Sequence, residues 1–158
     1  MRVLRQEDVE GAAYHEAGHA VAARALGLPV PDLSMIPDEE TVGTCSYAVW
    51  VEADEDGRRE DTAAVSLAGA LAEEIAVGEF NEEIAEDDLL HAIGLADEVT
   101  EAPDERDAWL DRAQDRAEEV LRRDWAAVEA LAEALLARRL LSAAEAEEII
   151  AEALTTDH

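Results

Sequence analysis

Two histidines four residues apart are the residues in this chain best suited to chemistry. His15 and His19 flank Glu16, and the 158-residue chain has only four histidines. In an α-helix, side chains four residues apart lie on one face, so both imidazoles can bind one metal ion. Zinc accepts neutral imidazole and keeps an open position when the protein supplies three ligands. Glu16 is placed to act as general base toward water at the metal, so the pattern predicts a hydrolytic zinc site. The alternative is a chance pattern, in which both histidines are partly buried polar residues of an alanine-rich helix.

The composition favours a single helical domain. Apolar residues make up 49% of the chain, aromatic residues only 4%, and alanine is abundant. Such a chain builds its core from closely packed helices. The single cysteine, Cys45, excludes an internal disulfide and a multi-cysteine metal site, and we expect it to be a small buried residue. We therefore expect one mainly α domain that spans residues 1–158.

The charge of the chain is strongly one-sided. The chain has 40 acidic and 12 basic residues, which gives a formal net charge of −28, and all the basic residues are arginine. Such a surface repels phosphate backbones and anionic lipids, so neither nucleic acid nor a membrane surface is an expected partner. The N-terminus does not resemble a signal peptide, and no apolar run approaches the ~20 residues that span a bilayer. The expected location is the cytoplasm.

The elements that must position the histidine pair follow from hydrophobic spacing. A first helix is predicted at about 6–27, where Gly27 and Pro29 end it. A short strand is expected at 33–36, and strict alternation predicts another over 41–52. That second strand is either an edge that holds substrate backbone or a structural hairpin over the helices.

The rest of the chain is predicted to be helical. Asp61 is the expected N-cap of a helix that ends at Gly78, and a loop follows over 79–86. The next helix is predicted to open near Asp87 and Asp88 and to stop before Pro103. The remaining helices are expected at about 104–123, at 124–138 and after a capping box at Ser142. The fold class is thus about six helices with a small β element of two to three short strands.

The histidine pair is the first of several short motifs that occur in a fixed order along the chain. They are His15-Glu16-Ala17-Gly18-His19-Ala20, Met35-Ile36-Pro37, Leu67-Ala68-Gly69 with Ala72-Glu73-Glu74, Asp87-Asp88-Leu89 with Ala92, and Leu131-Ala132 with Leu135-Leu136. The ordered set resembles the peptidase domain of the FtsH-type ATP-dependent zinc metalloproteases and covers nearly the whole chain. The resemblance implies a zincin-like helical domain that hydrolyses peptide bonds, and association of copies into a ring.

The third metal ligand is suggested by this resemblance. The family's aspartate, in an Asn-Asp-Leu segment that opens a helix, corresponds to Asp88, with Asp87 in the place of the asparagine. The macrodipole would keep a carboxylate in the first turn of a helix ionised. The residues themselves leave other candidates open: Glu73, Glu74, Asp87 and His91.

The chain also departs from the family pattern. A phosphate-binding loop requires lysine, and this chain has none, so ATP hydrolysis is not expected of it. The segment 81–86 is more acidic than in the family and lacks glycine. We expect a zinc-dependent metalloendopeptidase that acts on unfolded or partner-delivered polypeptides. The alternatives are an inactive zinc-binding interaction module and a detached protease subunit that needs a separate ATPase.

Overall fold

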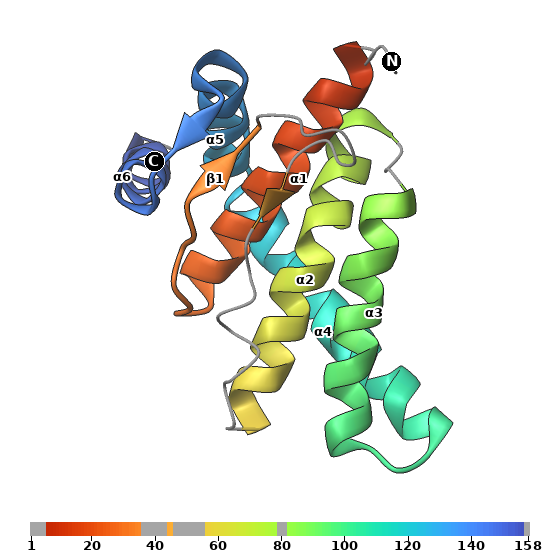
Figure 1. Ribbon diagram of the computed structural model, residues 1–158. Coiled ribbons are helices and arrows are strands. Elements are labelled where there is room, and N and C mark those ends of the chain that lie inside the picture. Colours follow the sequence, from red (N-terminus) through yellow and green to blue (C-terminus); the bar gives the residue numbers. More distant parts are fainter. Residues whose placement is uncertain (1–5, 36–43, 46–55, 79–81, 157–158) are drawn as a thin grey trace.

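The computed structural model describes residues 6–35, 44–45, 56–78 and 82–156. Within these ranges the chain forms six helices and three short strands (Figure 1). The helices are α1 (Gln6–Ala25), α2 (Asp56–Val77), α3 (Glu82–Val99), α4 (Pro103–Arg123), α5 (Trp125–Arg138) and α6 (Ala143–Thr156). The strands are β1 (Leu33–Ser34), β2 (Thr44–Cys45) and β3 (Leu140–Leu141). The predicted mainly α fold with a small β element is confirmed. No helix in the described part is both long and apolar enough to cross a membrane.

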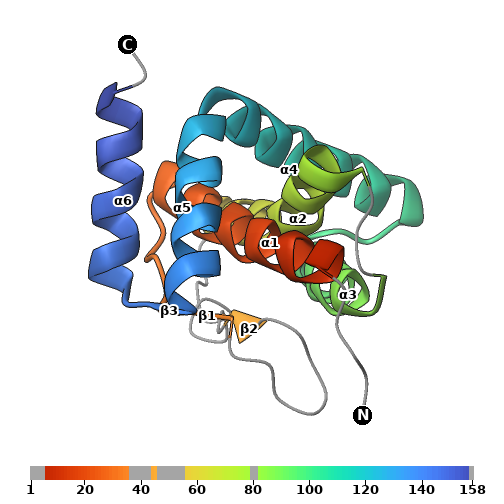
Figure 2. The same cartoon turned by 90° about the horizontal axis from the view of Figure 1, so that it is seen from above.

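Helix α1 lies at the centre of the molecule, between α2 and α5 (Figures 1 and 2). On the side away from α1, helix α2 contacts α3 and α4, and α6 packs against α5. The interface of α1 and α2 is built from small side chains, because a Cβ atom at Gly18 would lie only 2.6 Å from the Ala72 Cβ atom. The fully buried alanines of the two helices include Ala13, Ala17, Ala20, Ala64, Ala68 and Ala72. The abundance of alanine is thus explained by the close approach of these helices.

The three strands form one small antiparallel sheet in the order β2-β1-β3. Leu33 of β1 is the partner of Cys45 on one side and of Leu141 on the other. The sheet lies beside α1, on the side away from α4 (Figure 2). The strand predicted at 33–36 is present at its first two residues. Of the strand predicted over 41–52, only residues 44–45 lie within the described part, and β3 was not expected.

Two predicted helix starts are wrong. Helix α2 begins at Asp56, so Asp61 is no N-cap but lies inside the helix, where its carboxylate accepts a hydrogen bond from Arg116 of α4. Early in α2, Arg59 Nε donates to Glu98 Oε2 of α3 over 2.9 Å. These contacts to neighbouring helices hold the polar first turns in helical conformation. Helix α3 likewise begins at Glu82, because acidic residues are well tolerated at a helix N-terminus, and most of the predicted loop is helical.

The predicted helix ends are confirmed. Gly27 and Gly78 follow α1 and α2 with positive φ angles of 78° and 85°. Glycine adopts this left-handed conformation without steric cost, which is why it commonly ends helices.

Candidate metal centre

The histidine pair projects from the middle of α1 toward α3. Both His15 and His19 are only 2% exposed. From α3, Asp88 places its Oδ2 atom 2.8 Å from His15 Nε2 and 3.1 Å from His19 Nε2. One ligand atom from each residue lies within 4.8 Å of the other two. The structure thus brings together the three residues that we expected as ligands, and their role in binding a metal stays a prediction.

Each imidazole is also held through its second ring nitrogen, Nδ1. His19 Nδ1 lies 2.7 Å from the Val65 carbonyl oxygen of α2, and His15 Nδ1 lies 3.2 Å from Glu73 Oε1. A carbonyl oxygen can only accept, so His19 Nδ1 must carry the proton. In a neutral imidazole the Nε2 atom then carries a lone pair, and this lone pair faces Asp88. Metal-binding histidines are commonly oriented by a carbonyl or carboxylate in this way.

This arrangement of atoms calls for a positive charge. Two Nε2 lone pairs and a carboxylate oxygen would repel one another unless protons or a metal ion lay between them. Burial alone would lower the pKa of His15, but its hydrogen bonds with Asp88 and Glu73 raise that pKa to about 9. Burial likewise opposes ionisation of Asp88, yet its hydrogen bonds with His15 and His19 hold its pKa well below the usual range. The donor set therefore fits a cation.

A glycine on α2 leaves space beside both imidazoles. A Cβ atom at Gly69 would lie 2.4 Å from His19 Nε2 and 2.7 Å from His15 Nε2. These distances are far below van der Waals contact, so only glycine fits at this position. A glycine inside a helix costs about 1 kcal/mol relative to alanine. Its place within the alanine-rich α2 is the sequence signal that could have identified it as part of the site.

Glu16 lies next to the ligand pair and is buried. Its side chain is 2% exposed, and its negative charge contributes to raising the pKa of His15. A carboxylate buried next to two candidate metal ligands is at a position where a general base could act.

The other candidates for third ligand lie elsewhere. Glu73 contacts the Nδ1 atom of His15, on the far side of the ring from Asp88, so it supports a candidate ligand and does not join the cluster. Glu74 and Asp87 are exposed and lie outside the cluster. The imidazole Nδ1 of His91 shares a 2.7 Å hydrogen bond with Ser66 Oγ.

The expected cause of Asp88 ionisation was wrong. Because α3 begins at Glu82, Asp88 is in the second turn of the helix and not in the first. The macrodipole acts mainly in the first turn, so hydrogen bonds from the imidazoles are the main cause of its low pKa.

Two histidines one turn apart on one helix, together with a carboxylate from another helix, form a set of donors that could hold a single metal ion. The chain is 34% identical over 105 residues to "ATP-dependent zinc metalloprotease FtsH 1" of Sorangium cellulosum (strain So ce56). The match covers 62% of this chain but only 16% of that protein. No family model matches the chain. The similarity indicates an FtsH-like relation over part of the chain.

Proposed function

We propose that this chain is a zinc-dependent metallopeptidase domain that hydrolyses peptide bonds in unfolded or partner-delivered polypeptides. The observation that carries the proposal is the convergence of both Nε2 atoms of the histidine pair on one oxygen of Asp88. The buried carboxylate of Glu16 beside this pair and the partial similarity to a zinc metalloprotease support it.

His15, His19 and Asp88 would hold the zinc ion. When bound, zinc supplies a Lewis acid that polarises a peptide carbonyl and makes water acidic enough to lose a proton near neutral pH. Glu16 would accept that proton from the attacking water and return it to the nitrogen of the leaving amine. Glu73 and the Val65 carbonyl oxygen would keep the two imidazoles in place during this step.

The small sheet offers a place for the substrate backbone. Among the described residues, β2 is at an edge of the sheet, and it contacts α1, which carries the histidine pair. An extended polypeptide could add to such an edge through main-chain hydrogen bonds. We propose that an unfolded polypeptide binds in this way.

Substitution of the base separates metal binding from chemistry. We expect Glu16→Gln to retain one zinc per chain, measured by elemental analysis, and to lose at least ~100-fold in cleavage of an unfolded casein substrate. His19→Ala and Asp88→Ala should lose both the metal and cleavage. Glu147→Gln, at an exposed position of α6, is the matched control and should behave as wild type. Cleavage by Glu16→Gln at the wild-type rate would rule out the proposed mechanism.

The partners of the domain are part of the same proposal. The similar protein is named as ATP-dependent, and we propose that a separate ATPase delivers folded substrates to this domain, which would work as a homo-oligomer. Cleavage of unfolded casein but not of a folded protein, with the folded protein cut only after an ATPase is added, would agree with this. Zinc binding without cleavage of either substrate would favour the interaction module instead.

A further inference from the structure

Asp88 reaches the histidine pair from α3, a helix whose main packing partners are α2 and α4. Both histidines are on α1, which packs on α2 and α5. The position of the Asp88 carboxylate relative to the imidazoles therefore depends on how α3 is held on α2.

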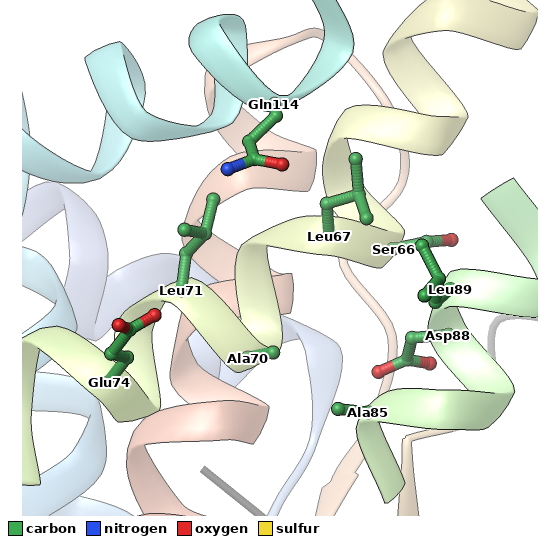
Figure 3. A pocket seen from close by; sticks show the side chains of 9 residues that line it. All are labelled: Ser66, Leu67, Ala70, Leu71, Glu74, Ala85, Asp88, Leu89 and Gln114. Carbon is green, nitrogen blue, oxygen red and sulfur yellow. The ribbon is translucent and has the colours of Figure 1, made fainter. Parts of the chain in front are cut away.

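The half of α3 that carries Asp88 is weakly packed. The buried apolar residues described for this helix lie in its second half and are Ala92, Leu95 and Ala96. None of residues 85–90 is buried, and Leu89 is 46% exposed. Beside Asp88 a pocket of about 190 Å³ opens between α2, α3 and α4 (Figure 3). Apolar packing therefore does not fix the first half of α3 against α2.

A hydrogen bond joins α2 and α3 within one turn of Asp88. Ser66 lies at the same end of the pocket as Asp88 (Figure 3), and its Oγ atom is 2.7 Å from His91 Nδ1 of α3. His91 follows Asp88 by three residues, a rise of about 4.5 Å along the helix. Ser66 likewise precedes Gly69 by three residues, and Gly69 is the position of α2 that lies against both imidazoles. The bond thus ties the two helices together where both reach the candidate metal centre.

His91 is a costly residue at this position. Its Nε2 atom is buried and has no hydrogen-bond partner among the described residues. A buried polar atom without a partner destabilises a fold, and leucine at the same position would avoid that loss. Burial also lowers the pKa of His91, so its imidazole is neutral at pH 7 and acts through its hydrogen bond, not through a charge. The bond to Ser66 therefore explains this histidine better than packing does.

We infer that His91, through its hydrogen bond with Ser66, positions the Asp88 carboxylate as the third metal ligand, an inference that rests on the metal binding proposed above. The bond takes the place of apolar contacts in the first half of α3 and limits how far Asp88 can move from the imidazoles. Residues that orient a metal ligand commonly contribute about 10- to 100-fold to metal affinity. His91 acts on Asp88 through the backbone of α3, so we expect an effect at the lower end of this range.

The test compares zinc affinity with stability in the double variant Ser66→Ala/His91→Leu. Both polar groups are replaced by apolar ones, so neither partner of the bond is left unpaired. We expect the metal-free variant to unfold at the same urea concentration as the wild type, or at a higher one. Its zinc affinity, measured by competition with a chromophoric chelator, should fall about 10-fold. A residue that acts only on packing would instead change both quantities in the same direction.

A conservative variant tests whether the hydrogen bond is the cause. Asparagine offers an amide group near the position of the imidazole Nδ1 atom, so His91→Asn can still bond with Ser66. This variant should bind zinc nearly as tightly as the wild type, and adding Ser66→Ala to it should remove that rescue. Glu98→Ala is the matched control, because it removes a 2.9 Å contact between Arg59 of α2 and the other end of α3. It should leave zinc affinity unchanged.

Hydrogen exchange in the metal-free protein provides a readout that does not depend on zinc. In the double variant the amides of residues 86–90 should exchange several times faster than in the wild type, because the first half of α3 opens more often. The amides of residues 95–98, in the buried half of the helix, should exchange as before. Equal exchange at 86–90 in the two proteins would overturn the inference.

Two further outcomes decide between this inference and the proposed function. Unchanged zinc affinity in the double variant, or an equal loss in His91→Asn, would overturn the positioning role even if casein is cut. If the wild-type protein binds zinc and the variants behave as expected but casein is not cut, the hydrolase proposal fails and the positioning role of His91 stands.

Discussion

Gly69 lies on α2 opposite the two imidazoles, at the point where any side chain would collide with their Nε2 atoms. We expect Gly69→Ala to lose most of its affinity for zinc, at least ~100-fold, because the added methyl group displaces the histidine rings. The measurement is zinc affinity by competition with a chromophoric chelator. Unchanged affinity in Gly69→Ala would show that the rings can move aside.

Gly94 provides the matched control for this substitution. It lies inside α3, and nothing comes within 4 Å of a Cβ atom built there. Gly94→Ala should therefore bind zinc normally and gain about 0.5–1 kcal/mol in free energy of unfolding, because alanine loses less backbone entropy in a helix.

The pKa of His15 predicts how the metal-free protein responds to pH. In the folded chain this pKa is raised from 6.5 to about 9 by hydrogen bonds with Asp88 and Glu73 that outweigh burial. The protonated imidazole therefore stabilises the fold fully below pH 6.5, and this contribution is lost as pH rises through 9. We expect chelator-treated protein to lose up to about 3 kcal/mol of unfolding free energy over this interval.

Urea unfolding at pH 6 and at pH 9.5 measures this loss, with His15→Gln as the reference that lacks the titrating group. The same proton competes with zinc, so zinc affinity should rise as pH rises toward 9. If the stability of the wild-type protein and that of the His15→Gln variant changed equally with pH, the effect could not be assigned to the His15 imidazole.

Among the elements, α6 shows how a local signal determines where a helix starts. The Glu145 amide donates to Ser142 Oγ over 3.1 Å, and the Ser142 amide donates to Glu145 Oε1 over 3.1 Å. This is the capping box that the sequence predicts. Asp32, which precedes β1, adds a cap from a distant part of the chain, since its Oδ1 accepts from the Ala143 amide over 2.8 Å.

We expect Ser142→Ala to lower the free energy of unfolding by about 1 kcal/mol, because the Glu145 amide in the first turn of α6 loses the Ser142 Oγ acceptor. Thermal or urea unfolding measures the change, and zinc content should stay at the wild-type value. Thr155→Ala removes a hydroxyl group near the other end of α6, where it donates to the Ala151 carbonyl oxygen one turn earlier. That control should be nearly neutral, and an equal loss in both variants would argue against the cap.

Helix α3 shows where spacing alone misleads. The spacing of Leu89, Ile93, Ala96 and Val99 predicts one apolar stripe along this helix. The structure buries Ala96 together with Ala92 and Leu95, but it leaves Leu89 exposed. The packing of α2 against α3 determines which face of α3 is covered.

For the whole molecule, the net charge of −28 sets the response to salt. Repulsion among carboxylates destabilises the compact state, and the Debye length falls from ~30 Å at 0.01 M salt to ~3 Å at 1 M. The melting temperature should therefore rise between these concentrations by several degrees, since about 1 kcal/mol corresponds to ~2–4 °C in a domain of this size.

Scanning calorimetry at pH 7 measures the effect. At pH near 4 many carboxylates are protonated, so the rise should shrink there. A flat response at pH 7 would mean that charge repulsion does not limit stability.

The sequence by itself determines the features that depend on neighbours along the chain. The helix that carries His15 and His19, their common face, the capping box and the glycines at two helix ends all follow from local geometry and backbone preference. The mainly α fold follows from alanine-rich helical spacing. Even so, the starts of α2 and α3 were misplaced. Contacts with α3 and α4 extend α2, and acidic residues are tolerated in the first turn of α3.

Only the tertiary structure decides which distant groups meet. Several carboxylates and His91 could complete the ligand set, and resemblance alone favours Asp88, which lies 73 residues beyond His15. Packing of α2 on α1 and of α3 on α2 brings Asp88 to the Nε2 atoms, turns Glu73 to the opposite ring nitrogen and places Gly69 against both rings. Covalent geometry constrains residues one turn apart, whereas groups on different helices meet only through the packing of whole faces.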